Sequence, residues 1–331
     1  MRVGGARGVA RFSSPDAAQA AARLDSTSVA RNLAIVCTSA RQCINAAPLT
    51  KGLMKYRHQY HAGNFADVHK HVLLLDVLDA LVRKDKGLLF VDTHAGSGSY
   101  SLHPGDAQHP QEWQSGIARL LAGKPRHAAL TRYRDLVAGG VHGGSLEYPG
   151  SPALAMRVLR AVDRAVFHEM QRDAAGALRK VLDGAARTRV ESTDGFAGLR
   201  ALLPPPERRG CVLIDPPYEE RQDFARVHDA LVDSLQRFPT GVLVAWLPVK
   251  LRGDFDHWFA SLGRAVTRPM LASLLWVHPT DSRAALNGSA LVVVNPPYLL
   301  EQASREWLPE LPALLGAPQG GCEVLATSER G

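Results

Sequence analysis

Hydrophobic residues follow two alternating patterns along the chain from Met54 onward. Helical spacing of apolar residues predicts helices at Ala66–Val82, Ser151–Ala161, Met170–Leu182 and Asp223–Arg237. Short apolar runs typical of buried strands lie at Leu88–Asp92, Ala165–Glu169, Cys211–Asp215, Gly241–Leu247, Leu271–Val277 and Ala290–Asn295. Strands that alternate with helices indicate an α/β domain in which helices cover both faces of a parallel sheet.

One stretch interrupts this alternation. Residues 104–150 contain helical patches at Gln111–Leu121 and Ala128–Val137 and no clear strand. Connections between neighbouring elements of such a sheet are usually much shorter. We therefore expect a small helical insertion within a single domain that spans residues 54–331.

The first 53 residues differ in composition from the rest. They hold six arginines and one lysine against two aspartates, and so carry +5 of the formal net charge of +7. Their apolar runs are too short for a secretory signal. An organellar transit peptide, a disordered arm, or translation upstream of a true start at Met54 would each explain them, and we favour the last. The net charge alone is therefore weak evidence for a nucleic-acid partner.

Composition excludes several other classes of protein. A chain with 46% hydrophobic and 21% charged residues is neither disordered nor collagen-like. No run of about 18 apolar residues occurs, so we expect no membrane span. The four cysteines show neither metal-ligand nor redox spacing, which favours a reduced, cytoplasmic protein.

A glycine-rich turn follows the first predicted strand, in the sequence Asp92-Thr93-His94-Ala95-Gly96-Ser97-Gly98. Glycines at such a turn let the backbone bend sharply and approach a ligand closely. A dinucleotide fingerprint would need a third small residue after Gly98, which is missing. The D-x-x-x-G-x-G pattern instead resembles the S-adenosylmethionine (SAM) loop of class I methyltransferases. A generic glycine turn explains these residues almost as well.

Two further acidic positions follow predicted strands. Glu169 ends a strand, where a carboxylate can accept hydrogen bonds from both hydroxyls of a ribose. Asp194-Gly195 is placed to accept a hydrogen bond from an adenine amino group. Taken alone, an exposed strand-end acid and a simple Asp-Gly turn explain these residues better.

The sequence Asp215-Pro216-Pro217-Tyr218 directly follows another strand and resembles the catalytic motif of amino-group methyltransferases. An adenine N6 amine is a poor nucleophile because its lone pair is delocalised into the ring. The Asp215 carboxylate and the Pro216 carbonyl can accept its hydrogens and draw the nitrogen toward tetrahedral geometry. Tyr218 offers a ring on which a base can stack. A rigid Pro-Pro turn is the structural alternative.

A second motif of the same kind is Asn295-Pro296-Pro297-Tyr298. Chain order distinguishes the two. Asp215 ends the strand that follows the Asp194 region, where the catalytic strand of such a sheet belongs, whereas Asn295 ends the last predicted strand. We therefore interpret Asn295 as a structural strand terminus.

Basic and aromatic residues interleave between Lys55 and His71, which suits phosphate contact together with base stacking. The segment also contains His61, His69 and His71. The ligand spacing of a metal-binding helix is absent, so we expect no metal site.

These motifs together resemble one family. YRHQYHAGNFADVHKH, VDTHAGSGSY, YPGSP, DGF and LIDPPYE occur in order, and the chain from Met54 to about Leu311 is similar to the bacterial 23S rRNA adenine-N6 methyltransferases called RlmJ. The resemblance implies a class I, Rossmann-like fold with a mixed seven-stranded sheet and a helical insertion. It also implies SAM as methyl donor, 23S rRNA as substrate and a monomer. The family begins about where Met54 stands.

The resemblance also implies roles for individual residues. Asp215, Pro216 and Tyr218 correspond to the catalytic motif. Tyr56 and, with less support, Lys70 correspond to RNA contacts. The positions that correspond to the SAM site are His71, His94, Gly96, Gly98, Ser151, Glu169, Asp194 and Gly195.

Three alternative functions stay open at this point. A DNA adenine-N6 methyltransferase would use the same motifs, although no separate target-recognition domain is evident. A non-catalytic RNA-binding relict of the fold is disfavoured by the presence of both Glu169 and Asp215. A nicotinamide-dependent oxidoreductase is disfavoured by the missing third glycine.

Overall fold

The computed structural model describes residues 61–103, 111–142, 145–280 and 286–328, all within the compact unit Ala47–Gly331. The predictions for residues 1–53 and for Tyr56 lie outside these residues. None of the described helices is long and apolar enough to cross a membrane.

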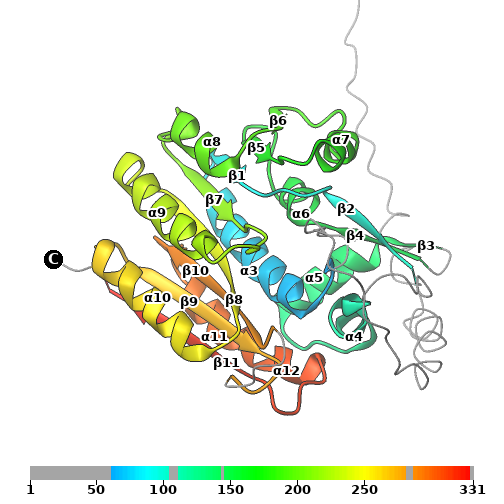
Figure 1. The fold of residues 1–331 in the computed structure, drawn as a ribbon. Coiled ribbons are helices and arrows are strands. Elements are labelled where there is room, and N and C mark those ends of the chain that lie inside the picture. Colours follow the sequence, from blue (N-terminus) through cyan, green and yellow to red (C-terminus); the bar gives the residue numbers. More distant parts are fainter. Residues whose placement is uncertain (1–60, 104–110, 143–144, 281–285, 329–331) are drawn as a thin grey trace, which may run out of the picture. The chain divides into compact units, whose positions relative to one another are not determined.

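An eight-stranded mixed sheet forms the centre of the domain, in the order β11-β9-β10-β8-β7-β1-β5-β6 (Figure 1). The strands from β6 to β8 run parallel, while β10 is antiparallel to both of its neighbours and β11 is antiparallel to β9. Their bounds are β1 (Leu89–Asp92), β5 (Arg164–His168), β6 (Thr188–Glu191), β7 (Gly210–Ile214), β8 (Val242–Val249), β9 (Met270–Trp276), β10 (Gly288–Val294) and β11 (Gly321–Thr327). The α/β class is confirmed.

The eighth strand is an addition to the seven that were predicted. β11 pairs only with β9 and lies at the edge of the sheet. Its sequence, GCEVLAT, is interrupted by Glu323, and only Val324 is buried because the strand lies at the edge. A pattern search for buried strands therefore misses it.

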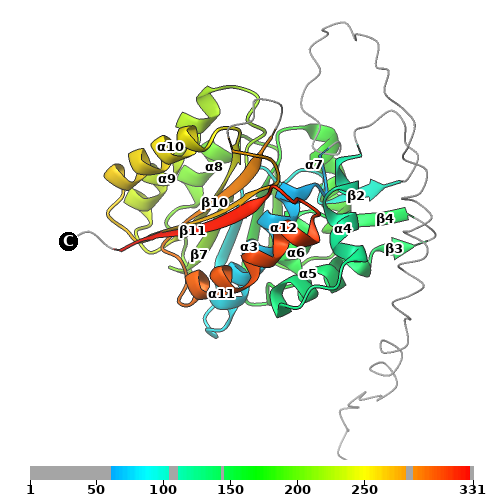
Figure 2. The ribbon, with the colours of Figure 1, turned by 90° about the horizontal axis from the view of Figure 1, so that it is seen from below.

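Helices cover both faces of the sheet (Figures 1 and 2). One layer contains α3 (Phe65–Val82), α6 (Ser151–Met156) and α11 (Leu300–Trp307), and the other contains α8 (Gly195–Leu202), α9 (Gln222–Arg237) and α10 (Arg252–Ala265). A further helix, α7 (Arg172–Val181), packs beside β6. The strands that face both layers are buried throughout, as β7 and β10 show.

The helix α3 is buried on nearly all sides. Its N-terminus is capped by Asn64, whose side chain accepts hydrogen bonds from the backbone N–H groups of Ala66 and Asp67. Beyond the cap the helix contacts α5, α6, α11 and β10, which explains why apolar residues surround it rather than forming one stripe. Polar side chains on α3 therefore lie inside the protein and require partners there.

The insertion differs from the prediction that it would be helical. It contains η2 (Glu112–Gln114), α4 (Ile117–Ala122) and α5 (Ala128–Ala138), but also a small antiparallel sheet. In this sheet β4 (Ser145–Pro149) pairs with β3 (Val141–His142) and with β2 (Ser99–Leu102), which precedes the insertion. These strands have two to five residues, too few to produce a clear period. Because β2 precedes the insertion and β4 ends it, their pairing brings the start and the end of the insertion together.

The C-terminal segment completes the fold. After α11 the chain forms η3 (Leu308–Glu310) and α12 (Leu311–Leu314) before it enters β11. Glu310 accepts hydrogen bonds from the backbone N–H groups of Arg126 and His127 and so holds the start of α5.

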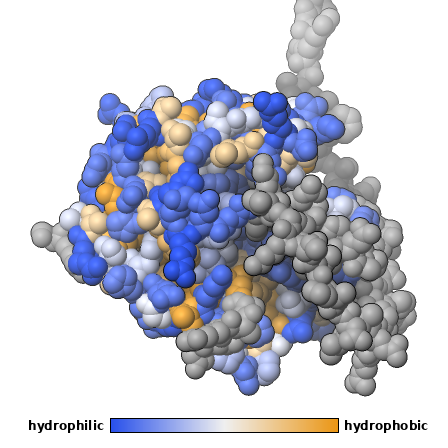
Figure 3. Space-filling model, viewed as in Figure 1, coloured by the Kyte–Doolittle hydropathy of each residue, from blue (hydrophilic) through white to orange (hydrophobic). Residues whose placement is uncertain are grey.

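On the face shown in Figure 3 hydrophilic residues predominate, with apolar residues scattered between them.

Candidate functional site

Polar residues meet at the carboxyl ends of β1, β5 and β7. These strands are parallel and adjacent, with β1 between the other two. The chain leaves β1 toward β5 and returns on the other side through β7, so the strand order reverses beside β1. Open α/β sheets bind ligands at such a point. Asp92, Glu169 and Asp215 all lie at or just after these strand ends.

The glycine-rich turn is joined to the next strand by Glu169. Gly96 and Gly98 have φ values of +62° and +77°, a conformation that favours glycine. The Gly96 N–H donates a hydrogen bond of 2.9 Å to Glu169 Oε2, and the Gln171 N–H donates one of 2.7 Å to Oε1. A carboxylate has about four acceptor positions, so Glu169 retains capacity for two further donors, as a ribose would require.

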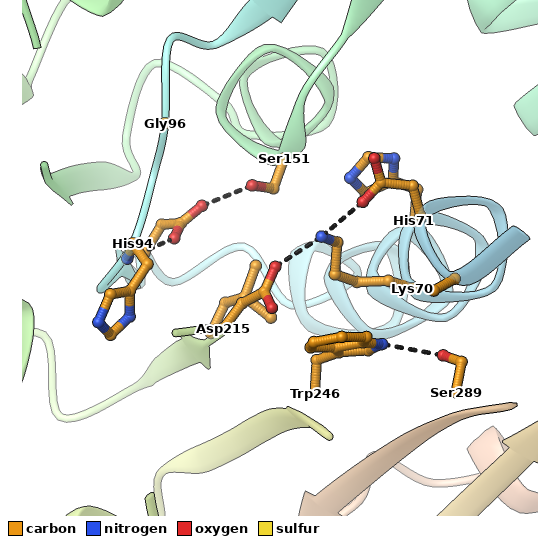
Figure 4. Close-up of polar contacts among 12 residues, drawn as sticks. Lys70, His71, His94, Gly96, Ser151, Asp215, Trp246 and Ser289 are labelled. Atoms are coloured by element: carbon orange, nitrogen blue, oxygen red, sulfur yellow. Dashed lines mark hydrogen bonds and ion pairs between the residues drawn. The ribbon is translucent and has the colours of Figure 1, made fainter. Parts of the chain in front are cut away.

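Asp92 links the same turn to α6. Its Oδ2 accepts a hydrogen bond of 2.7 Å from Ser151 Oγ, and its Oδ1 accepts one of 3.1 Å from the His94 N–H (Figure 4). Burial raises the pKa of Asp92 to about 6, although both hydrogen bonds oppose that change. The predicted residues His94 and Ser151 are thus brought together through a side chain that belongs to the motif but was not itself predicted to bind.

His94 and His71 occupy different surroundings. Burial lowers the pKa of His94 to about 4, so its ring is neutral at pH 7, and its edge packs on Phe196 with 5.0 Å between ring centroids. His71 is 1% exposed, and its Nδ1 lies 2.8 Å from the hydroxyl of Tyr148. That contact ties α3 to the insertion. The structure therefore shows His71 in a packing role, and its predicted cofactor contact stays a prediction.

Asp194 caps α8 and forms an ion pair. Its Oδ1 accepts a hydrogen bond of 2.8 Å from the Phe196 N–H, and its Oδ2 lies 2.9 Å from the Arg226 guanidinium. The same guanidinium stands 4.4 Å from the centroid of the Phe196 ring. A Cβ atom at Gly195 would lie 2.0 Å from the Thr93 carbonyl oxygen, so this position admits only glycine. Sequence reasoning missed Arg226, since an arginine on an amphipathic helix carries no distinguishing pattern.

Asp215 is held by a buried lysine from α3. Lys70 Nζ lies 2.6 Å from Asp215 Oδ2 and 2.7 Å from Asp67 Oδ1 (Figure 4). Burial disfavours the charge on Lys70, but the two carboxylates outweigh this and raise its pKa well above the ordinary range. Lys70 is 4% exposed, and its ammonium pairs with Asp215 at the start of the Asp-Pro-Pro-Tyr motif. Its expected RNA contact stays a prediction.

Tyr218 is fixed at the other end of the motif. Its φ of +51° is unusual for a residue other than glycine, and such strain is frequent at functional sites. The hydroxyl donates a hydrogen bond to the Trp246 carbonyl oxygen, and the ring packs on Phe224 and Trp246 with centroid distances of 4.7 and 5.6 Å. Pro216 is buried. Trp246 was not predicted, because in the sequence it is one apolar residue within a strand.

The second motif follows a strand that runs in the opposite direction. β10 is antiparallel to β8 and ends with Val294 beside Leu243, at the start of β8, whereas β7 is parallel to β8 and ends with Ile214 beside Ala245. The Asn295 side chain donates hydrogen bonds of 3.0 and 2.8 Å to the carbonyl oxygens of Pro239 and Gly241. The interpretation of Asn295 as a structural strand terminus is confirmed.

The three histidines of the basic segment diverge in space. His61 lies 3.0 Å from Glu112, His69 lies between two serines of the sheet, and His71 faces Tyr148. Within the described part of the chain, no group of three or more histidine, cysteine or acidic residues is arranged to hold a metal ion.

Comparison with known proteins finds relatives that match most of the chain. The family model described as "Ribosomal RNA large subunit methyltransferase D, RlmJ" matches residues 85–326. Proteins named ribosomal RNA large subunit methyltransferase J match at 38% identity in Escherichia coli, over 78% of this chain and 93% of the relative, and at 37% in Haemophilus influenzae, over 81% and 96%. A crystal structure from Legionella pneumophila is 30% identical and superimposes with a TM-score of 0.73, over 81% of this chain and 98% of that one.

Proposed function

Because the chain belongs to the RlmJ family of ribosomal RNA large subunit methyltransferases, we propose that it methylates N6 of one adenine in 23S rRNA. SAM supplies the electrophilic methyl group. The adenine N6 lone pair attacks the methyl carbon while the carbon–sulfur bond breaks, and one N6 proton leaves as methyladenine forms. The products are N6-methyladenine and S-adenosylhomocysteine.

The ion pair between Lys70 and Asp215 is the observation that carries this proposal. Lys70 Nζ lies 2.6 Å from Asp215 Oδ2. Asp215 Oδ1 accepts no hydrogen bond from the described residues and is available to an amine. A carboxylate oxygen that accepts an N6–H bond draws electron density toward the nitrogen as positive charge develops there. The Pro216 carbonyl accepts the second N6–H bond, and the Tyr218 ring supports the base.

The cofactor groups fit the other polar residues of this edge. Glu169 accepts the two ribose hydroxyls with the lone pairs that Gly96 and Gln171 leave free. The turn at Gly96 and Gly98, whose positive φ values favour glycine, binds the methionine portion, next to Ser151 and a neutral His94 that adds no positive charge beside a sulfonium. Asp194 accepts the adenine amino group in the direction that Arg226 leaves open.

The test follows transfer of label from tritiated SAM to protein-free 23S rRNA and to duplex DNA. The wild-type enzyme should label rRNA, with the label recovered as N6-methyladenine after nuclease digestion. Asp215→Ala should lower kcat by about 10³-fold because it removes the amine acceptor. Label in DNA and none in rRNA would overturn the substrate, and bound SAM with no label on either would favour a relict fold.

A second arm tests the cofactor site. Glu169→Ala should raise the Kd for S-adenosylhomocysteine by at least tenfold, as expected for the loss of hydrogen bonds to a charged acceptor. Glu191→Ala is the matched control, since Glu191 ends the neighbouring strand β6 and pairs with Arg189 instead. Equal losses in the two variants, measured by calorimetry, would contradict the assignment.

The remaining expectations belong to the same proposal. The enzyme acts as a monomer, which sedimentation at micromolar concentration tests. A chain that starts at Met54 retains full activity, because every group assigned above follows that residue. A severe loss of activity in that shorter chain would show that residues 1–53 take part.

A further inference from the structure

A buried histidine next to Lys70 joins three strands of the sheet through hydrogen bonds. His69 Nε2 lies 2.8 Å from Ser273 Oγ on β9, and Nδ1 lies 3.0 Å from Ser289 Oγ on β10. Trp246 on β8 donates a hydrogen bond of 2.9 Å from its indole Nε1–H to the same Ser289 Oγ. His69, Ser273 and Ser289 are all fully buried, and the mechanism above uses none of them.

The chemistry of these groups fixes the role of Ser289 toward the indole. The indole N–H can only donate, so Ser289 Oγ accepts from it. Burial lowers the pKa of His69 to about 3, so the imidazole is neutral and has one donor and one acceptor nitrogen. In either tautomer His69 bonds to both serines, and Ser289 accepts from Trp246. Trp246 is thereby held in one orientation.

Trp246 contacts Tyr218 at one end of the catalytic motif and lies beside Lys70, the partner of Asp215 at the other end. Its ring lies 6.0 Å from Lys70 Nζ, within range of a cation–π interaction with the lysine that holds Asp215 (Figure 4). Its backbone carbonyl accepts the hydrogen bond of Tyr218, and its ring packs against the Tyr218 ring.

We propose that Trp246 is a positioning residue of the methyl-transfer site. Ser289 and His69 fix the orientation of its indole, and the indole in turn fixes the positions of Lys70 and Tyr218. This inference rests on the proposed function. A buried polar chain stabilises a protein little more than apolar packing would, whereas it specifies one orientation of a planar ring. Its contribution therefore falls on kcat, through the placement of Asp215 and Tyr218, and not on SAM binding.

The experiment compares two serines that differ in one contact. Ser289→Ala removes the acceptor of the indole, whereas Ser273→Ala removes a hydrogen bond of His69 at the far end of the chain. Both residues are fully buried on strands, but Ser289→Ala loses two hydrogen bonds and Ser273→Ala one. Tm is therefore measured for both variants, and kcat is compared at a temperature at which both are folded. Ser289→Ala should lower kcat on rRNA about tenfold with an unchanged KM for SAM, and Ser273→Ala at most about twofold.

Two substitutions of the ring itself provide a second measurement. Trp246→Phe keeps an aromatic face beside Lys70 and should retain much more activity than Trp246→Leu, although both lose the indole N–H. The ¹⁵N-indole resonance of Trp246, assigned by its absence in Trp246→Phe, should move strongly in Ser289→Ala. Equal kcat losses in the two serine variants, or full activity of Trp246→Leu, would overturn the proposal.

The two proposals fail in distinguishable ways. A wild-type enzyme that labels no RNA would refute the proposed function. A wild-type enzyme that labels rRNA, combined with serine variants that follow Tm alone, would refute only the positioning role of Trp246.

Discussion

The two Pro-Pro-Tyr motifs have the same spacing but follow strands that run in opposite directions in one sheet. Asp215 follows a parallel strand and reaches Lys70, whereas Asn295 follows an antiparallel strand and binds backbone carbonyls. Tyr218 is packed between aromatic rings, while Tyr298 is 87% exposed. The comparison shows that strand direction, more than the motif letters, decides which carboxyl or amide side chain faces a ligand site.

The two motifs also differ in the charge of the groups around them. Around Asp215 the structure gathers a buried lysine and two further buried acids, Asp67 and Asp92. The partners of the Asn295 side chain are neutral carbonyl groups. Substitutions at the first motif should therefore affect catalysis and pH dependence, and substitutions at the second should affect only stability.

After Asp215→Ala itself, the largest effect is expected from Lys70→Met. This substitution keeps much of the buried volume but removes the ammonium that lies between Asp67 and Asp215. The two carboxylates then repel each other, and the Asp215 carboxylate turns away from the amine. We expect a loss in kcat of about 100-fold, comparable to the removal of one preorganised charge. Single-turnover methylation of rRNA measures it, and Lys70→Arg should recover part of the loss. Unchanged kcat would show that the ion pair does not orient Asp215.

The next effect concerns pH. Burial raises the pKa of Asp92 to about 6, above its ordinary 3.8, so its protonated form is favoured in the folded state. The resulting stability is fully present below about pH 4 and is lost as pH rises through 6. Relative to Asp92→Asn, the wild-type protein should lose about 3 kcal/mol between pH 4 and 7.

Urea denaturation across this range measures the difference. At the second motif, Asn295→Ala should shift the unfolding free energy by the same amount at every pH, because its side chain binds two backbone carbonyl oxygens, which do not titrate. A flat difference for Asp92→Asn would show that Asp92 is not stabilised in its protonated form.

Asn295→Ala should itself destabilise the protein by about 2 kcal/mol. It loses two hydrogen bonds to backbone carbonyls, and alanine tolerates its φ of +54° poorly. The kcat of the folded enzyme should not change, because the residue lies far from Asp215 along β8. Loss of activity beyond the unfolded fraction, compared by thermal melts and initial rates, would contradict the structural role of this motif.

The smallest effect is expected from Arg226→Ala. The guanidinium orients Asp194 and covers one face of Phe196, but it is partly exposed, so its ion pair is screened by solvent. The KM for SAM should rise about fivefold with little change in kcat. Arg200→Ala serves as control, since Arg200 pairs with Asp233 on α9 away from the site. Equal KM changes in both variants would remove Arg226 from the cofactor site.

Much of this molecule follows from the sequence itself. Six of the eight main strands, the helices α3, α6, α7 and α9, the glycines at positions 96, 98 and 195, and the acids Glu169 and Asp215 after β5 and β7 were predicted. Such features depend on residues near one another in the chain: periodicity decides helix or strand, and a turn with positive φ admits few residues besides glycine. The short strands of the insertion have too few residues to show a period, and the edge strands β6 and β11 are only partly buried, so they lack the continuous apolar run of an inner strand.

Tertiary structure alone decided which side chains are partners. Lys70 and Asp215 are 145 positions apart, and they meet only because α3 packs against the sheet beside the end of β7. The same holds for Arg226 with Asp194 and for Trp246 with Ser289 and His69. A local pattern cannot specify such contacts, because they depend on strand order and direction and on the burial that makes an unpaired charge or hydrogen-bond donor too costly to leave alone.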